Sequence, residues 1–195
     1  MTANVLNNRG FTLIELIVTM GVAALLLTIG VPNFIELVRN HRMAAQYNDF
    51  VAALNSTRSE AIKRGTGITI CKRNVAGTAC NSGGNWEGGW LVFLDQDRDG
   101  VVDTGEPIVR LYEALTGSNT LRRNIATSRI TYNGQGFASG LGLPPAASTF
   151  KFCDIRGASH AKGLILSNNG RARRAIDINA DGIVEDGSSN NITCP

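Results

Sequence analysis

The sequence predicts an α+β protein in which one long N-terminal helix packs on an antiparallel β-sheet. Two observations support this prediction. Residues 11–64 place apolar side chains first in a continuous stretch and then at steps of three and four, which is the period of a helix. Residues 66–195 contain many glycines and short β-favouring runs, with no helical pattern between them of the kind that a parallel sheet requires. We therefore expect a helix over 11–64 and a β-rich globular domain over 66–195.

The first part of the expected helix is apolar enough to cross a membrane. Residues 11–31 contain only three threonines and Glu15 as polar residues, and at about 1.5 Å per residue they span the hydrocarbon layer. A secretory signal cleaved after Gly30 is the alternative. A membrane helix is favoured because an acid lies inside the apolar stretch and the helical pattern continues beyond Pro32. A carboxylate in such a segment is costly, so Glu15 needs a partner.

The helical pattern continues as an amphipathic stretch. Its apolar side chains recur every three or four residues, while charged residues occupy the other faces. Gly65 and Gly67 predict the end of the helix. The apolar stripe that we expect to pack on the sheet consists of Phe34, Leu37, Val38, Ala44, Tyr47, Phe50, Val51, Leu54, Ala61 and Ile62.

Seven short runs after the helix are predicted strands. They are rich in β-branched, aliphatic and aromatic residues and are bounded by turn-forming residues. The simplest architecture is one antiparallel sheet on the apolar face of the helix. The predicted strands are 68–71, 90–94, 108–112, 129–132, 149–152, 163–166 and 175–178.

Positive charge is concentrated in one part of the globular domain. Residues 116–174 hold 9 basic side chains and a single acid, Asp154, although the whole chain has a net charge of only +3. Residues 175–195 are net negative. Because 43% of the residues are hydrophobic and only 18% are charged, the composition is that of a globular protein and not of a disordered one. The uneven charge makes an anionic partner worth testing.

The cysteines indicate disulfide bonds. Cys71, Cys80, Cys153 and Cys194 lack the paired spacing and the histidines of a zinc site. Disulfides imply an oxidising compartment, which agrees with a chain exported behind its N-terminal segment. Nearest-neighbour pairing joins Cys71 to Cys80 and Cys153 to Cys194, but four cysteines permit three connectivities.

Residues 9–15, with the sequence RGFTLIE, resemble the cleavage and assembly motif of type IV prepilins and pseudopilins. The resemblance implies that a prepilin peptidase cuts after Gly10, so that residues 1–10 form a leader peptide. The same enzyme would methylate the new terminal amine of Phe11. The helix would then hold the protein in the inner membrane, with the globular domain in the periplasm, until it joins other pilins or pseudopilins in a filament.

The resemblance also supplies a partner for Glu15. In this family the acid at this position engages the terminal amine of a neighbouring subunit during filament assembly. An acid in the first turn of a helix is in addition favoured by the helix dipole. The alternative, in which Glu15 only neutralises the terminus of its own chain, stays open.

Residues 86–95, with the sequence WEGGWLVFLD, resemble the globular domain of the GspH/FimT family of minor pilins, as does the Asp/Gly loop that follows. Together with the N-terminal motif, the resemblance covers most of the chain and implies the type IV pilin fold. It leaves two functions open. One is a minor pilin of a type IV pilus, and the other is the minor pseudopilin H of a type II secretion system.

The segment Gly170-Arg171-Ala172-Arg173-Arg174 is a candidate DNA-binding site. Alternate residues of an extended segment point to the same side, so Arg171 and Arg173 could contact successive phosphates, while Arg174 would point elsewhere. The segment resembles the glycine-arginine-any-arginine motif of FimT-type pilins that bind DNA in natural transformation. The resemblance implies sequence-independent DNA binding, to which Lys162 would add.

Other basic side chains and nearby acids bear on this site. In the alternative interpretation, Asp177, Asp181 and Glu185 neutralise the arginines in a solvated turn. The further residues that could contact phosphates are Arg122, Arg123, Arg129, Lys151 and Arg156.

Residues 95–106 fit the twelve-residue calcium loop of EF-hands. Acids occupy its first, third, fifth, ninth and twelfth positions, and glycine occupies the sixth. An EF-hand has a helix on each side, whereas strands are predicted here, so a hairpin with Asx turns is the alternative. Residues 177–182 are a weaker copy that we interpret as a turn. The candidate calcium ligands are Asp95, Asp97, Asp99, Val101, Asp103 and Glu106.

Catalytic motifs are not apparent in the sequence. Neither of its two histidines, His41 and His160, lies in a nucleophile motif, a metal triad or a phosphate-binding loop. We expect no enzymatic activity and no required cofactor.

Overall fold

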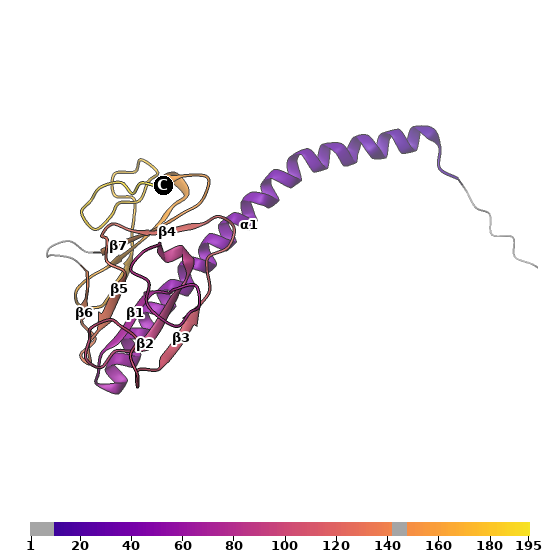
Figure 1. Cartoon of the computed structure of the whole chain (residues 1–195). Helices are drawn as coiled ribbons and strands as arrows, with labels where there is room; N and C mark the ends of the chain where they lie inside the picture. The colour runs from indigo at the N-terminus through magenta and orange to yellow at the C-terminus, as the bar shows by residue number, and fades with distance from the viewer. Residues whose placement is uncertain (1–9, 142–147) are drawn as a thin grey trace, which may run out of the picture. The chain divides into compact units, whose positions relative to one another are not determined.

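The computed structural model describes residues 10–141 and 148–195 (Figure 1). The chain divides into two compact units, of which the first ends at His41 and the second covers Arg42–Pro195. Residues 1–9, which make up most of the predicted leader, lie outside the described residues.

A long helix, α1 (Leu13–Arg64), forms the N-terminal element, close to the predicted bounds. It begins after Thr12, whose hydroxyl oxygen accepts a hydrogen bond of 3.3 Å from the backbone N–H of Glu15. It ends at Arg64, and the next residue, Gly65, has φ of 67° and donates a backbone hydrogen bond to the carbonyl of Ile62. Glycine is common in this left-handed position after a helix because it has no Cβ.

The N-terminal part of α1 is long and apolar enough to cross a membrane. Pro32 lies inside the helix, and the neighbouring Asn33 donates a side-chain hydrogen bond of 2.9 Å to the carbonyl of Ile29. A helix that is apolar on all faces is typical of a membrane span. The exposed apolar side chains before His41 include Leu13, Ile14, Leu16, Ile17, Met20, Leu25, Leu26, Leu27 and Ile29.

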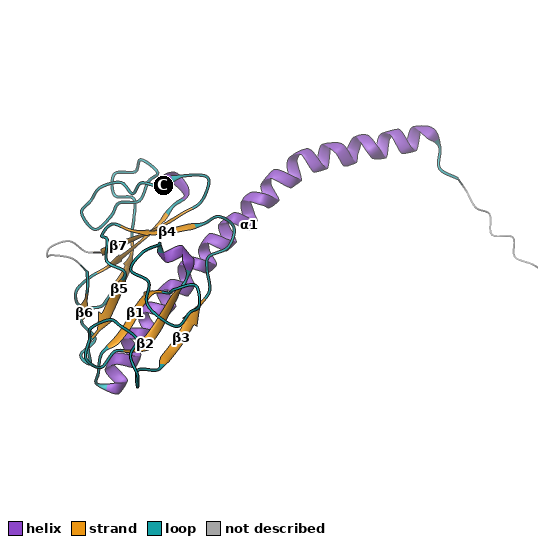
Figure 2. Ribbon diagram, in the orientation of Figure 1, coloured by secondary structure: helices purple, strands orange, loops and turns teal. Residues whose placement is uncertain are grey.

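The first β-sheet is antiparallel and has the strand order β3-β2-β1-β5-β6. A short 3-10 helix, η1 (Trp86–Gly88), precedes β2. Figure 2 shows these strands as orange ribbons. Their bounds are β1 (Ile68–Lys72), β2 (Trp90–Leu94), β3 (Ile108–Tyr112), β5 (Arg129–Tyr132) and β6 (Ala138–Ser139).

The second β-sheet is also antiparallel and has the order β4-β7-β8-β9. A second 3-10 helix, η2 (Ala158–His160), lies between β7 and β8. The predicted fold class, a long helix packed on antiparallel β structure, is confirmed, but the strands form two sheets where the sequence suggested a single one. The strands are β4 (Thr120–Arg123), β7 (Ser148–Cys153), β8 (Lys162–Leu166) and β9 (Ala172–Arg174).

One hydrophobic core joins residues 43–61 of α1 to both sheets. Phe50 is fully buried at its centre and makes ring contacts with side chains from each sheet. Its ring centroid lies 4.9 Å from that of Trp90 on β2 and 4.8 Å from that of Phe150 on β7. Aromatic pairs of this kind contribute about 0.5–1.5 kcal/mol each beyond the burial of their surface.

The predicted apolar stripe of α1 is correct only in its C-terminal half. Tyr47, Phe50, Leu54 and Ala61 are buried, whereas the earlier members, such as Phe34, are exposed, and so is the last member, Ile62. The buried part of the stripe lies wholly within the second unit.

Two disulfides fasten loops of the second unit. Cys71 pairs with Cys80, and Cys153 pairs with Cys194, which are the nearest-neighbour pairs. Each bridge contributes about 2–4 kcal/mol in the chain-entropy account. Cys153–Cys194 holds the C-terminal segment, residues 176–195, against β7.

The C-terminal segment covers the face of the second sheet opposite the main core. The Gly187 N–H donates 2.9 Å to the hydroxyl of Thr149 on β7, and the Lys151 ammonium donates 3.3 Å to the hydroxyl of Thr193. Thr149 and its cross-strand neighbour Ile165 are both buried. This cover explains why strands β7 and β8 are buried on both faces.

The observed strands differ from the predicted ones in three places. The segment 175–178, predicted as a strand, is a loop, and strand β9 lies just before it. The short strand β6 and the strand β4 were not predicted. Both β4 and β9 contain adjacent arginines, which do not favour a strand by themselves. Their extended conformation depends on pairing with β7 and β8, so the sequence did not predict it.

Candidate functional site

The candidate DNA-binding segment forms the turn and the second strand of the β8–β9 hairpin. The Gly170 N–H donates 2.9 Å to the Ser167 carbonyl, and the Ser167 N–H donates 3.1 Å to the Arg171 carbonyl. Gly170 has φ of 74°, and a Cβ at this position would lie 2.1 Å from the backbone oxygen of Gly136. Glycine is therefore required by the fold itself, whatever binds to the neighbouring arginines.

Arg171, just before β9, and Arg173, within it, are both exposed, and the alternation of an extended chain places them on the same side of the hairpin. Arg173 pairs with Ile165 on β8, so its side chain belongs to the face that the C-terminal segment covers further along the sheet. Strand β9 is at the edge of its sheet, which leaves both arginines accessible. Within the two described ranges, no carboxylate pairs with either arginine.

The acids of the C-terminal segment bind backbone N–H groups instead. Asp177 accepts 2.7 Å from the N–H of Ala180 and 2.8 Å from that of Gly182. Glu185 is buried and accepts 2.8 Å from the N–H of Ile178.

The acid between them, Asp181, is also engaged. It accepts 2.8 Å from the N–H of Ile183, and the hydrogen bonds that it receives, first among them that from Asn191, lower its pKa. The alternative in which these acids neutralise the arginines therefore has no support from the observed ion pairs. Residues 177–182 form a turn, as interpreted from the sequence.

Lys162 and Arg174 lie on the other face of the second sheet. The Lys162 ammonium is 5.8 Å from the ring centroid of Tyr47 on α1. Burial, and then repulsion from Arg174, lower the pKa of Lys162. Burial raises the pKa of Tyr47, and Arg174 partly opposes this. The five predicted DNA-binding residues are thus divided between a turn and two faces of one hairpin.

Most of the further basic residues are committed to the fold. Arg122 lies 2.6 Å from a carboxylate oxygen of Glu87, and Arg156 lies 2.7 Å from one of Asp154. Arg123 is half-buried, and burial lowers its pKa to about 9. Lys151 faces the C-terminal segment. Residues 116–174 therefore offer a smaller cationic surface than their net charge suggests. The sequence alone did not show which of these charges take part in internal contacts.

Three of the candidate calcium ligands come together in the loop between β2 and β3. One carboxylate oxygen from each of Asp95, Asp97 and Asp99 lies within 4.8 Å of the others, so this trio could hold a cation. Asp95 is fully buried, and one of its oxygens accepts a hydrogen bond from the Thr69 hydroxyl. Asp97 and Asp99 accept from the backbone N–H groups two residues ahead, as in Asx turns.

The other two acids among the candidate ligands, Asp103 and Glu106, are not in this group. Glu106 accepts 2.7 Å from the N–H of Gln96 and 3.3 Å from that of Asp103, so its carboxylate closes the loop. The Arg129 side chain lies against Gly100, where a Cβ would be 2.3 Å from it. The flanking elements are strands, as predicted, and the loop is a hairpin connection.

The N-terminal motif residues lie at the start of α1. Gly10 and Phe11 precede the helix and are exposed, and Glu15 is the third helical residue. Thr12 and Glu15 form the spacing of a capping box, in which a threonine hydroxyl accepts from the N–H three residues later. Sequence reasoning missed this role of Thr12, although the Thr-x-x-Glu pattern could have indicated it.

Comparisons with known proteins agree with these features. Residues 46–182 match the family model described as type II transport protein GspH, and residues 6–31 match the prokaryotic N-terminal methylation motif. No curated protein matches the sequence.

Solved structures share the fold at low sequence identity. The type IV minor pilin FimU of Pseudomonas aeruginosa is 19% identical with a TM-score of 0.55, over 82% of this chain and 99% of that chain. The minor pseudopilin EpsH from the type 2 secretion system of Vibrio cholerae is 11% identical with a TM-score of 0.44, over 68% of this chain and 95% of that chain. The similarity to FimU shows the type IV pilin fold. Because the GspH model spans more than two thirds of the sequence, the chain belongs to the GspH family of minor pilins and pseudopilins.

Proposed function

We propose that this chain is a minor pilin of a type IV pilus that binds DNA through Arg171 and Arg173 for uptake in natural transformation. The observation that supports this is the pair of exposed arginines on one side of an edge strand, with no paired carboxylate among the described side chains. The acids nearest in sequence bind backbone N–H groups and leave the arginines available.

Binding would be electrostatic and independent of sequence. Residues two apart in a strand are separated by about 6.6 Å, so the two guanidinium groups can contact different phosphates of one backbone. Each contact releases condensed counterions from the DNA, which makes the affinity fall steeply with salt. The exposed Arg174 and the half-buried Lys162, on the other face of the hairpin, would contribute long-range attraction.

The N-terminal motif supports a maturation pathway in the same proposal. A prepilin peptidase cleaves between Gly10 and Phe11 and methylates the Phe11 amine. The helix anchors the precursor in the inner membrane with its globular domain in the periplasm. Glu15 then pairs with the terminal amine of a neighbouring subunit as the protein enters the filament. No step requires a catalytic group of this chain.

A DNA titration tests the binding site. The full chain in an uncharged detergent is titrated into fluorescent double-stranded DNA over a series of salt concentrations, alone and with Arg171→Gln and Arg173→Gln combined. We expect the slope of log affinity against log salt to become shallower by about 2 in the double variant. The matched control combines Lys63→Gln with Arg110→Gln, which removes two exposed charges from other elements.

The proposal fails if binding is absent or insensitive to salt, or if the two double variants weaken it equally. In that case the second candidate is favoured, namely the minor pseudopilin H of a type II secretion system, which has a structural role and does not bind DNA. The description of the matching family as a type II transport protein favours it. Deleting the gene would then reduce protein secretion and leave transformation unchanged.

A further inference from the structure

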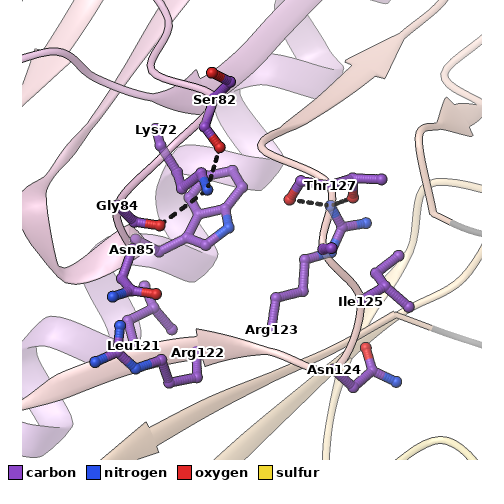
Figure 3. A pocket seen from close by; sticks show the side chains of 12 residues that line it. Lys72, Ser82, Gly84, Asn85, Leu121, Arg122, Arg123, Asn124, Ile125 and Thr127 are labelled. Atoms are coloured by element: carbon purple, nitrogen blue, oxygen red, sulfur yellow. Dashed lines mark hydrogen bonds between the residues drawn. The ribbon is translucent and has the colours of Figure 1, made fainter.

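A polar pocket lies beside β4, at the edge of the second sheet opposite β9. Its volume is about 420 Å³, and it is bounded by the end of β1, the segment before η1 and the loop that follows β4. Figure 3 shows Lys72 on one side of the pocket and Arg123 on another. The polar side chains that matter here are Lys72, Asn85, Trp86, Arg122, Arg123 and Asn124, and no acid is among the lining residues.

Lys72 is a buried cation with only neutral partners. The residue is 7% exposed. The ammonium donates 3.1 Å to the Gly84 carbonyl and 3.4 Å to the Ser82 carbonyl (Figure 3). Burial, followed by repulsion from Arg123, lowers its pKa, and attraction from Glu87 partly opposes this. Carbonyl oxygens satisfy two of its three protons but do not neutralise its charge.

Arg123 is a second cation of the pocket, half-buried and without a carboxylate partner among the described residues. Its guanidinium donates 2.7 Å to the Gly140 carbonyl and 3.3 Å to the Arg129 carbonyl. It also donates to the hydroxyls of Thr127 and Ser148. All of these acceptors are neutral. A buried charge is costly unless an opposite charge accompanies it, so the two cations together favour an anion in the pocket.

The acid nearby, Glu87, is already engaged. One of its oxygens lies 2.6 Å from the Arg122 guanidinium, and the other accepts 3.3 Å from the N–H of Leu121. It therefore offsets the charge of Arg122 directly and attracts Lys72 only from a distance. No carboxylate of the described residues forms an ion pair with Lys72 or Arg123.

Trp86, which also lines the pocket, has an unused donor. The residue is 2% exposed, and its indole N–H has no hydrogen-bond partner in the described part of the chain. A buried donor without an acceptor costs about 1–3 kcal/mol, and an oxyanion in the pocket would remove that cost.

We propose that this pocket binds a small oxyanion of the phosphate or carboxylate type, held by the Lys72 ammonium, the Arg123 guanidinium and the Trp86 indole N–H. The site is independent of the DNA-binding proposal, because β4 and β9 are opposite edges of the second sheet. Its ligand would neutralise one buried and one half-buried cation and join β1, η1 and β4. The ligand is either a free phosphate ion or a carboxylate presented by another molecule.

The indole N–H signals of the two tryptophans test the proposal directly. The full chain, labelled with nitrogen-15 in an uncharged detergent, is titrated with sodium phosphate and, separately, with sodium chloride at equal ionic strength. Phosphate should move the Trp86 signal to saturation and leave that of Trp90 in place. Trp90 is a good internal reference because its indole N–H is also buried and unpartnered but lies outside the pocket lining.

A lysine variant identifies the cation. Lys72→Met keeps the aliphatic stem and should weaken phosphate binding by at least about tenfold. Without phosphate, the melting temperature of the Lys72→Met variant should equal or exceed that of the wild type, because the variant lacks the buried ammonium charge. Lys151→Met is the matched control on the covered face of the second sheet and should bind phosphate normally.

The outcomes separate the ligand sources. A stronger response to acetate than to phosphate supports the oxyanion site and assigns a carboxylate as its natural ligand. A Trp86 signal that phosphate and acetate leave in place overturns the proposal. So does a Trp86 shift caused by duplex DNA and abolished by Arg171→Gln, because the pocket would then be part of the DNA surface.

Discussion

At the scale of single residues, the start of α1 gives Glu15 two roles that the sequence did not separate. Its backbone N–H is capped by the Thr12 hydroxyl, and its carboxylate lies in the first turn, where the helix dipole favours negative charge. Neither contact requires a second subunit. The role in assembly must therefore be tested apart from the role in forming the helix.

Glu15→Val should leave membrane insertion intact and reduce incorporation into filaments. The valine removes the charge that is proposed to attract the terminal amine of a neighbouring subunit. Immunoblots of sheared filaments and of membrane fractions measure the two quantities. Thr12→Ala is the matched control, since it removes the cap, at a cost of about 1 kcal/mol, and keeps the acid. If both variants reduce incorporation equally, helix capping and not charge explains the effect.

Gly170→Ala should destabilise the globular unit more than the same change at another glycine with positive φ. Alanine in a left-handed conformation costs about 1–2 kcal/mol. At Gly170 the added Cβ would also meet the Gly136 carbonyl oxygen at 2.1 Å, whereas at Gly182, with φ of 87°, nothing lies within 4 Å. Urea denaturation of Gly170→Ala and Gly182→Ala separates the two terms. Equal losses of stability would show that the close approach does not matter.

At the scale of elements, the sequence predicted the strands whose own residues favour them. Strands β2, β3 and β5 have the predicted bounds, because each is a run of aliphatic, β-branched or aromatic residues. Strands β4 and β9 could not be predicted in this way, since they are extended because β7 and β8 pair with them. The alternation of an extended chain predicted that Arg171 and Arg173 share a side. The opposite placement of Lys162 depends on the pairing of β8 with β7 and β9, which the sequence did not show.

The β2–β3 loop should not depend on calcium for its structure. Its aspartates accept backbone hydrogen bonds, Glu106 is occupied by two N–H groups, and the Arg129 side chain lies against Gly100. We therefore expect the melting temperature to be the same with EDTA as with added calcium. An increase in the melting temperature with calcium, absent in Asp97→Asn, would instead assign a structural ion to the aspartate trio.

At the scale of the whole molecule, one side chain connects α1 to both sheets. Phe50 contacts the rings of Trp86 on η1, Trp90 on β2, and Phe150 and Phe152 on β7. The sequence correctly placed Phe50 on the apolar stripe but could not show that two sheets, and not one, meet there. The core of the Arg42–Pro195 unit depends on this meeting point.

Phe50→Ala should lower the free energy of unfolding of that unit by about 3–5 kcal/mol, because a fully buried aromatic ring leaves a cavity. Phe34→Ala removes an equal ring from the same helix at a position that is 65% exposed, and should leave the unfolding midpoint in urea unchanged. A similar loss in both variants would contradict the assignment of the core to residues 43–61 of α1.

The position of β9 at the edge of its sheet has a consequence for solubility. An edge strand has unpaired backbone N–H and C=O groups, to which a strand from another chain can pair. Charged side chains along the edge strand disfavour this pairing. Arg171 and Arg173 therefore protect this edge from aggregation, whether or not DNA is present. A variant without these two charges is expected to self-associate at its β9 edge, and this effect would be separate from any loss of DNA binding.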